Sequence, residues 1–261
     1  MDDFLSKLRI FLNSRKIFKN WYIYPKIYFK LTKYDSTIFE TKSGLKIKLR
    51  TNSTDLMALT NVWMIDEYKI KDYNINENDT IIDIGSHIGT FSLLVSQFCK
   101  KGKIFSYEPM PDNFEYLQKN LKLNQIKNIF PFNLAVSSDS SELDMFFNDD
   151  QSGHNIFSYN NKKITINSIS LKQIFDDNKI NSCKLLKLDC EGSEYQIIDA
   201  FPLEYFDRIE NLVMEYHFAD SKPELVEKLI SKIKTAGFKI KTNDHHNDMG
   251  FLIARRDTSK F

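Results

Sequence analysis

The stretch that decides the fold is Asp83-Ile84-Gly85-Ser86-His87-Ile88-Gly89. It continues an apolar, β-branched run that starts at Thr80 and is typical of a buried strand, and it precedes a helix-spaced apolar pattern that starts at Phe91. In open α/β folds a glycine loop between a strand and a helix is a common ligand site, because backbone N–H groups at the start of the helix face the ligand. The stretch therefore predicts an α/β domain that binds a ligand at this turn.

Strand patterns and helical patterns alternate from this loop onwards. Strands are expected at residues 80–84, 103–107, 129–134, 184–188, 210–216, 238–242 and 251–255, and helices at residues 91–98, 111–123, 193–200 and 223–236. This alternation is typical of a doubly wound, mostly parallel sheet with helices on both faces. Residues 135–170 interrupt it with Ser-, Asp-, Asn- and Gly-rich turns, which predict an inserted antiparallel hairpin or loop.

Residues 1–75 predict a helical and β-hairpin extension in front of a ligand-binding domain at residues 76–261. The expected elements of the extension are a hairpin at residues 36–40 and 45–49 and a helix at residues 54–68 that is capped by Asn52 or Ser53. The sequence contains no internal repeat, and no low-complexity linker separates the two units.

Basic residues are concentrated at the start of the chain. Residues 1–33 carry eight Lys or Arg and two Asp, so the other 228 residues sum to a net charge of −5 within a total of +1. A basic aromatic helix would lie on an anionic membrane surface or on a partner, or it would pack on the rest of the protein as a lid, which is the favoured interpretation. A nucleic-acid partner is not expected, because the remainder of the chain is slightly acidic.

Composition also gives an expectation about the compartment. The chain has no run of about 18 uninterrupted apolar residues, its first residues lack the pattern of a secretion signal, and its three cysteines have no metal-ligand spacing. These features predict a cytoplasmic protein without a metal site, with a peripheral position at the inner membrane face as an alternative.

The spacing of the loop residues bears on the kind of ligand. A dinucleotide loop needs three glycines so that a pyrophosphate reaches the helix, and here the series is Gly85, His87, Gly89 with no third glycine in place. That spacing suits a ligand without a phosphate, such as an adenosyl amino acid. Glu108 ends the second expected strand, where a carboxylate can accept both hydroxyls of a ribose. Because NAD also has a ribose, an NAD-dependent oxidoreductase stays an alternative.

Carboxylates and a histidine end the next two expected strands at the same edge of the sheet. Asp189 and Glu191 follow the fourth strand, and His217 follows the fifth. Such groups can hold an amino group of a cofactor, take a proton from a substrate hydroxyl or help to hold a divalent cation. We expect His217 or Asp189 to act as a general base with Glu191 orienting the substrate, and Glu194 to cap the following helix.

Four blocks of sequence together resemble the FkbM-type methyltransferases in order and spacing. The blocks are Asp83–Ser92, Glu108–Glu115, Lys187–Glu194 and Glu215-Tyr216-His217. The resemblance covers about residues 80–220 and implies a Rossmann-like class I fold with strand order 3-2-1-4-5-7-6, the last strand being antiparallel. It also implies that S-adenosylmethionine is the cofactor and that a hydroxyl of a sugar, glycan or polyketide-like small molecule is methylated.

The resemblance also implies roles for residues by position. Gly85 and Gly89 would line the methionine part of the cofactor, with His87 between them, and Glu108 would hold the ribose. Asp83 would support the methionine amine directly or through water, and the block that contains Asp189 would face the methyl group and the substrate. A catalytically inactive methyltransferase-like binding module is the second alternative. A nucleic-acid methyltransferase is a weaker one, because the fourth strand does not end in an Asn/Asp-Pro-Pro-Tyr type of motif.

Overall fold

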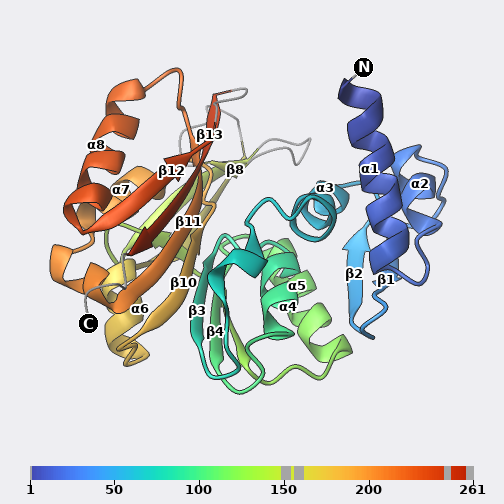
Figure 1. The fold of residues 1–261 in the computed structure, drawn as a ribbon, viewed down its shortest axis with the longest axis horizontal. Coiled ribbons are helices and arrows are strands. Elements are labelled where there is room, and N and C mark those ends of the chain that lie inside the picture. The colour runs from blue at the N-terminus through green and yellow to red at the C-terminus, as the bar shows by residue number, and fades with distance from the viewer. Residues whose placement is uncertain (1, 148–153, 156–161, 244–247, 257–261) are drawn as a thin grey trace.

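A computed structural model describes residues 2–147, 154–155, 162–243 and 248–256 (Figure 1). Its centre is a sheet of seven strands in the order β12-β13-β11-β10-β3-β4-β5. The bounds are β3 (Thr80–Ile84), β4 (Lys103–Tyr107), β5 (Ile129–Phe132), β10 (Cys183–Leu188), β11 (Ile209–His217), β12 (Phe238–Thr242) and β13 (Met249–Arg256). Only β13 runs antiparallel to its neighbours. The expected order 3-2-1-4-5-7-6 and the antiparallel last strand are confirmed.

Both faces of the sheet are buried, as the continuous apolar runs of its central strands require. Ile82 and Ile84 of β3 point to one face, and Ile81 points to the other, because side chains alternate along a strand. The first face is covered by α6 (Leu171–Asp177), α7 (Glu194–Ala200) and α8 (Pro223–Thr235). The second face is covered by α4 (Thr90–Ser96), α5 (Pro111–Leu123) and the N-terminal extension.

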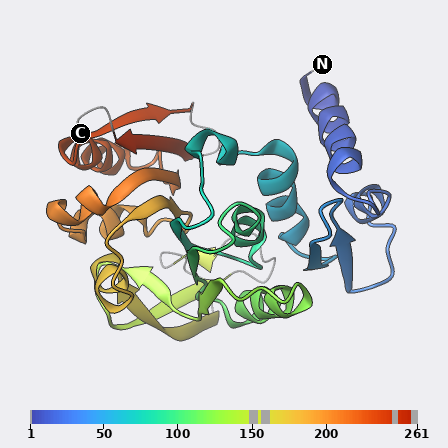
Figure 2. The ribbon, with the colours of Figure 1, turned by 60° about the horizontal axis from the view of Figure 1, so that its bottom comes forward.

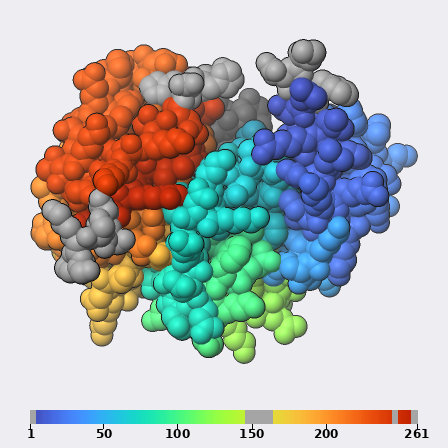
Figure 3. Space-filling model, in the orientation of Figure 1, coloured from blue at the N-terminus to red at the C-terminus, as the bar shows by residue number. Residues whose placement is uncertain are grey.

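The N-terminal extension shares one hydrophobic core with the second face of the sheet. Its elements are α1 (Asp2–Ile17), α2 (Ile23–Tyr28), β1 (Ser36–Glu40), β2 (Lys46–Arg50), α3 (Asp55–Leu59), the π-helix η1 (Thr60–Ile65) and the 3-10 helix η2 (Ile70–Tyr73). Phe18 is fully buried between the rings of Phe39 and Trp63, and Asn13 Nδ2 donates to Met64 O at 2.7 Å. Helix α1 therefore packs against η1 and is hydrogen-bonded to it. Figures 2 and 3 show the extension along one side of the molecule.

Two expected elements end earlier than the sequence pattern suggests. The helix expected at residues 54–68 ends at Ile65, because Asp66 is left-handed (φ 56°) and its side chain accepts the N–H of Ile70. The predicted cap by Asn52 or Ser53 is wrong, because the cap position is Thr54 and makes no side-chain capping bond; Ser53 Oγ accepts only from the backbone N–H of Asp55 in front of the first turn. The strand expected at residues 129–134 ends at Phe132, and the side chain of Asn133 donates to two backbone carbonyls instead.

The insertion before β10 contains the predicted antiparallel pair. A second sheet has the order β6-β9-β7-β8, formed by β6 (Ala135–Ser137), β7 (Glu142–Phe147), β8 (His154–Asn155) and β9 (Lys162–Ser170). Strands β7 and β9 pair antiparallel, and β6 pairs parallel with β9. Helix α6 follows directly and was not predicted, although Ser170 Oγ caps it by accepting from Gln173 N. Among the described residues, no helix is long and apolar enough to cross a membrane.

Candidate active site

A cavity of about 460 Å³ lies at the carboxyl ends of β3, β4, β10 and β11. This edge is where open α/β sheets bind ligands. Residues from the loop after β3 and from the ends of the other three strands line it, together with a wall from the N-terminal extension that runs from Thr54 to Tyr68. Strand order places Glu108 on the β4 side and a group of carboxylates on the β10 and β11 side.

The glycines of the loop after β3 are needed for the backbone conformation and for close packing. Gly85 has φ +75°, and a Cβ there would lie 1.8 Å from the carbonyl oxygen of Asp189, so this residue lets the ends of β3 and β10 meet. Gly89 (φ +86°) precedes α4 and packs on Leu117, and it is not among the residues that line the cavity. Of the two glycines, only Gly85 is therefore placed to meet a ligand directly.

Glu108 is buried at the cavity wall and is held in place by backbone groups. Its Oε2 accepts from His87 N at 2.7 Å and its Oε1 from Met110 N at 2.9 Å. Burial raises the pKa of Glu108 to about 7, although these N–H donors favour the charged form. Asn113 Nδ2 also donates to Oε1, at 3.4 Å. A carboxylate offers about four acceptor positions, so one remains for a ligand that carries a hydroxyl.

His87 lies at the centre of the loop in a left-handed conformation (φ 51°) and lines the cavity. Its Nε2 is 3.5 Å from Asp55 Oδ1, and its buried Nδ1 has no hydrogen-bond partner within the described part of the chain. Burial lowers the pKa of His87 to about 4, so the ring is neutral near pH 7.

Asp83 does not line the cavity, but it contacts Lys187, which does. One of its oxygens accepts from Ser92 Oγ at 2.6 Å, and the other is 3.3 Å from Lys187 Nζ. Lys187 does line the cavity, and its Nζ donates to Gly85 O at 2.7 Å. Burial alone would lower the pKa of Lys187, but Asp83 and Asp189 raise it above its ordinary value. Any effect of Asp83 on a bound cofactor would thus pass through Lys187.

Four carboxyl groups gather on the β10 and β11 side: Glu67, Asp189, Glu191 and Glu215. Asp189 Oδ2 accepts from the hydroxyl of Tyr68 at 3.0 Å and lies 3.6 Å from Lys187 Nζ. Burial, with the charge of Asp189 second, raises the pKa of Glu67 to about 7 and also raises that of Glu215. The pKa of Glu191 is raised to about 7, again mainly by burial. Glu67, Glu191 and Glu215 can therefore gain or lose a proton near neutral pH.

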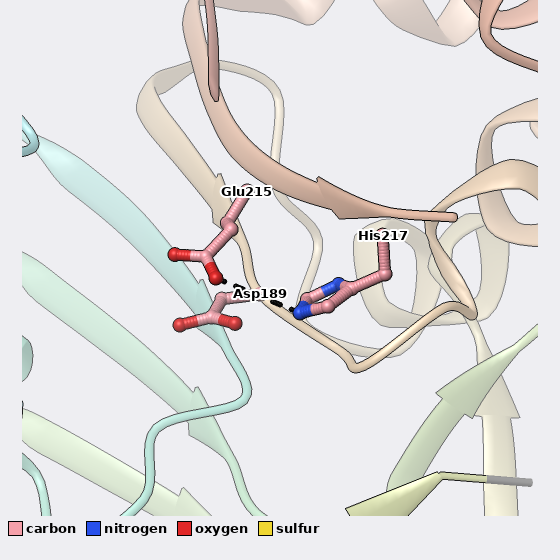
Figure 4. A group of neighbouring side chains, drawn as sticks. All are labelled: Asp189, Glu215 and His217. Carbon is pink, nitrogen blue, oxygen red and sulfur yellow. Dashed lines mark ion pairs between the residues drawn. The ribbon is translucent and has the colours of Figure 1, made fainter. Parts of the chain in front are cut away.

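His217 lies among these carboxylates and supplies a positive charge next to them. Figure 4 shows its ring pointing toward Glu215 and Asp189; Nε2 is 3.3 Å from Glu191 Oε2, and Nδ1 is 3.5 Å from Glu194 Oε1. Burial alone would lower its pKa, but Glu194, Glu191 and Asp189 raise it to about 10. The imidazole is therefore already protonated at neutral pH. This argues against the prediction that it is the base, and it is not among the cavity-lining residues.

Glu194 has a structural role, but it does not cap α7 by a hydrogen bond, which is the role that the sequence predicted; it lies in the first turn of the helix and binds the preceding loop. Its two oxygens accept from the backbone N–H groups of Cys190 and Gly192 and fix the loop in front of α7. Glu67, Tyr68 and Glu215 were missed as site residues. Glu215 could have been found, because it lies two residues before His217 on the same side of β11. No pattern in the sequence pointed to Glu67 or Tyr68.

Three residues of this region are close enough together to bind a metal cation. Asp189, Glu215 and His217 offer ligand atoms that all lie within 4.8 Å of one another. The absence of a metal requirement stays a prediction, and we expect methyl transfer to be unchanged by EDTA, because Lys187 and the imidazole already lie close to these carboxylates. Turnover measured after dialysis against EDTA, with and without added Mg²⁺ or Mn²⁺, checks this; restoration by either ion would show that the group holds a metal.

Comparison with known proteins finds relatives among methyltransferases. Hexuronic acid methyltransferase AglP of Haloferax volcanii is 26% identical over 180 residues, which cover 69% of this chain and 72% of that protein. Among solved structures, a precorrin-6y C5,15-methyltransferase of Geobacter metallireducens gives a TM-score of 0.48 at 14% identity, covering 75% of this chain and 89% of that one. TYW2 of M. jannaschii, solved in complex with AdoMet, gives 0.46 at 16% identity, covering 87% and 89%.

The family comparison covers the part of the chain that builds the cavity loops. The model of the methyltransferase FkbM domain matches residues 83–240, which is more than half of the chain and includes the loop after β3, Glu108 and the carboxylates of β10 and β11. The chain therefore belongs to the FkbM family of S-adenosylmethionine-dependent methyltransferases.

Proposed function

We propose that this enzyme methylates a hydroxyl group of a sugar, a glycan or a related small molecule. The observation that carries the proposal is the group of carboxylates that lines the same cavity as Glu108 and the loop after β3. A hydroxyl is a poor nucleophile until its proton is leaving, so a carboxylate beside the acceptor is what this reaction needs. Several of these groups have a pKa near neutral, which suits a general base.

The cavity fits the cofactor by its size and by its donor set. Its volume is within the range of small-molecule sites. Glu108 has an acceptor position left for a ribose hydroxyl, and Lys187 fixes the carbonyl of Gly85 at the turn where the loop starts. S-adenosylmethionine, when bound, supplies a methyl group on a positively charged sulfur.

Asp189 is the base that the geometry supports. It lies at the end of β10, lines the cavity and is oriented by the hydroxyl of Tyr68. As the oxygen of the acceptor bonds to the methyl carbon, the carbon–sulfur bond breaks with its electron pair going to sulfur, and the hydroxyl proton goes to Asp189. Holding the two reactants in line accounts for a large part of the acceleration.

The charge of the acceptor side bears on the choice of substrate. Carboxylates there disfavour the phosphate groups of a nucleic acid as the acceptor. The relative from Haloferax volcanii is by its name a hexuronic acid methyltransferase, which supports a sugar as the substrate class. A panel of neutral sugars, amino sugars and uronic acids, incubated with radiolabelled S-adenosylmethionine, tests the proposal. Transfer to none of these hydroxyl compounds would overturn it.

Glu108→Gln is expected to weaken binding of S-adenosylmethionine by about ten- to a hundredfold, because it removes a charged acceptor of a ribose hydroxyl. Hydroxyl donors favour the ionised carboxyl, so binding to the wild type should also weaken as the pH falls below about 7, where burial keeps Glu108 neutral. Titration calorimetry at several pH values measures both effects. The variant should lack this pH dependence, and the exposed Glu115→Gln change on α5 should alter neither.

The same titration separates the enzyme from an oxidoreductase. NAD should not bind measurably, because the loop lacks the third glycine that a pyrophosphate needs. Binding of NAD with an affinity similar to that of S-adenosylmethionine would contradict the assignment of the cavity.

A further inference from the structure

Large apolar side chains are exposed mainly on the N-terminal extension. Eight of the fifteen such side chains within the described part of the chain lie between residues 5 and 34: Leu5, Leu8, Leu12, Tyr22, Tyr28, Phe29, Leu31 and Tyr34. Single exposed apolar residues are ordinary on any protein, but a group of them on one segment marks a surface that contacts something other than water.

The densest part is the segment Tyr28–Tyr34, which we call the aromatic loop. Its four large apolar side chains, Tyr28, Phe29, Leu31 and Tyr34, are exposed by 46%, 65%, 71% and 78%. They alternate with Lys30 and Lys33, which are also exposed. An amphipathic aromatic ring next to a lysine is the combination found where proteins meet the headgroup region of a bilayer.

The backbone holds the aromatic loop in a fixed shape. At its start, Leu31 N donates to Lys26 O at 2.7 Å and Lys30 N to Ile27 O at 2.8 Å, which closes the end of α2. At its far end, the hydroxyl of Thr51 donates to Tyr34 O and ties the loop to the residue after β2. The apolar side chains are therefore presented outward from an ordered backbone, so a contact would cost little ordering entropy.

Helix α1 adds a second apolar stripe. Leu5, Leu8 and Leu12 are spaced by three and four residues, so they lie on one side of the helix, and each is exposed by more than 40%. The first turns of α1 project at the edge of the molecule (Figure 3). Arg9, Arg15 and Lys16 are exposed on the same helix.

Charge indicates what covers this surface. Residues 1–33 carry a net charge of +6, although the whole chain carries only +1. Two copies that met through the aromatic loop would bring their lysines together, which opposes a dimer at this surface. An anionic lipid surface both accepts the apolar side chains and attracts the lysines. We infer that the aromatic loop and the exposed stripe of α1 dock this enzyme on the surface of an anionic lipid bilayer.

Vesicle sedimentation of the full chain tests this inference. Wild-type protein should sediment with phosphatidylcholine vesicles that contain about 30 mol% phosphatidylglycerol, and about tenfold less with pure phosphatidylcholine. Phe29→Asp with Leu31→Asp should abolish binding to both. Lys30→Glu with Lys33→Glu should remove the preference for the anionic vesicles. Raising the salt to about 0.5 M should weaken wild-type binding, because it screens the lysines.

Matched controls change exposed residues elsewhere. Leu203→Asp in η3 (Leu203–Arg208) and Lys241→Glu in β12 alter one apolar and one basic side chain, and neither should affect sedimentation. Binding of S-adenosylmethionine by each variant, measured by calorimetry, verifies that the fold is intact. The inference is overturned if wild-type protein does not bind the anionic vesicles, if Phe29→Asp with Leu31→Asp still binds them, or if that variant instead abolishes a dimer in solution.

Discussion

Asp189→Asn is expected to lower turnover by about a hundred- to ten-thousandfold, the contribution of a positioned general base. The amide keeps the shape of the carboxylate and can still accept from the hydroxyl of Tyr68, so the substitution removes the proton acceptor and the negative charge next to Lys187. The variant should bind S-adenosylmethionine as the wild type does. Single-turnover rates with labelled cofactor, combined with calorimetry, measure the two quantities separately.

Two comparison variants make this result interpretable. Asp199→Asn changes an exposed carboxylate of α7 that pairs with Lys228, and it should leave turnover unchanged. Glu215→Gln removes a second carboxylate of the cavity and should cost less than Asp189→Asn, because Glu215 is not oriented by Tyr68. Near-wild-type turnover of Asp189→Asn together with a large loss in Glu215→Gln would transfer the role of base to Glu215.

Lys187→Met is expected to reduce the free energy of unfolding by about 3–5 kcal/mol. Lys187 and Asp83 are almost completely buried, and Nζ lies 3.3 Å from Asp83 Oδ1 and 3.6 Å from Asp189 Oδ2. Removing the cation would leave Asp83 as a buried charge whose Oδ1 has no hydrogen-bond partner within the described residues. Urea unfolding at pH 7 measures the loss.

A double substitution separates charge from packing in this prediction. Asp83→Asn with Lys187→Met removes both charges, and the amide oxygen can still accept from Ser92, so much of the lost stability should return. Lys184→Met on the same strand breaks an ion pair with Glu210 that is open to solvent on one side, and it should cost about 1 kcal/mol or less. If the double variant is as unstable as Lys187→Met, the cause is lost packing and not an uncompensated charge.

The strands of the main sheet could be predicted because their apolar runs are bounded by glycine, proline or polar residues. The order of those strands could not be derived from the residues, and came only from the resemblance to a family. Helix α6 was missed although Leu171, Ile174 and Phe175 are spaced as on a helix, because seven residues are too few to stand out from a loop-like segment.

The candidate site was predicted best where it follows a strand end. Glu108 and Asp189 were found because the carboxyl ends of parallel strands meet at one edge of the sheet. The role of His217 as a base stays a prediction, and its protonation could not be judged from the sequence, because it depends on Glu191 and Glu194, which reach it from another strand end and helix. Tyr68 lies 121 residues from Asp189 along the chain, and only the folded structure brings the two together.

The wall that runs from Thr54 to Tyr68 has a consequence for how this enzyme can change over time. The family model matches residues 83–240, so this wall lies outside the matched residues, although it faces the same cavity. Substitutions in α3 and η1 can therefore change the shape of the space for the acceptor, while the loop after β3 and Glu108, which we expect to bind S-adenosylmethionine, stay unchanged. Selection on this short segment would allow the same cofactor-binding residues to be used with acceptors of very different shape.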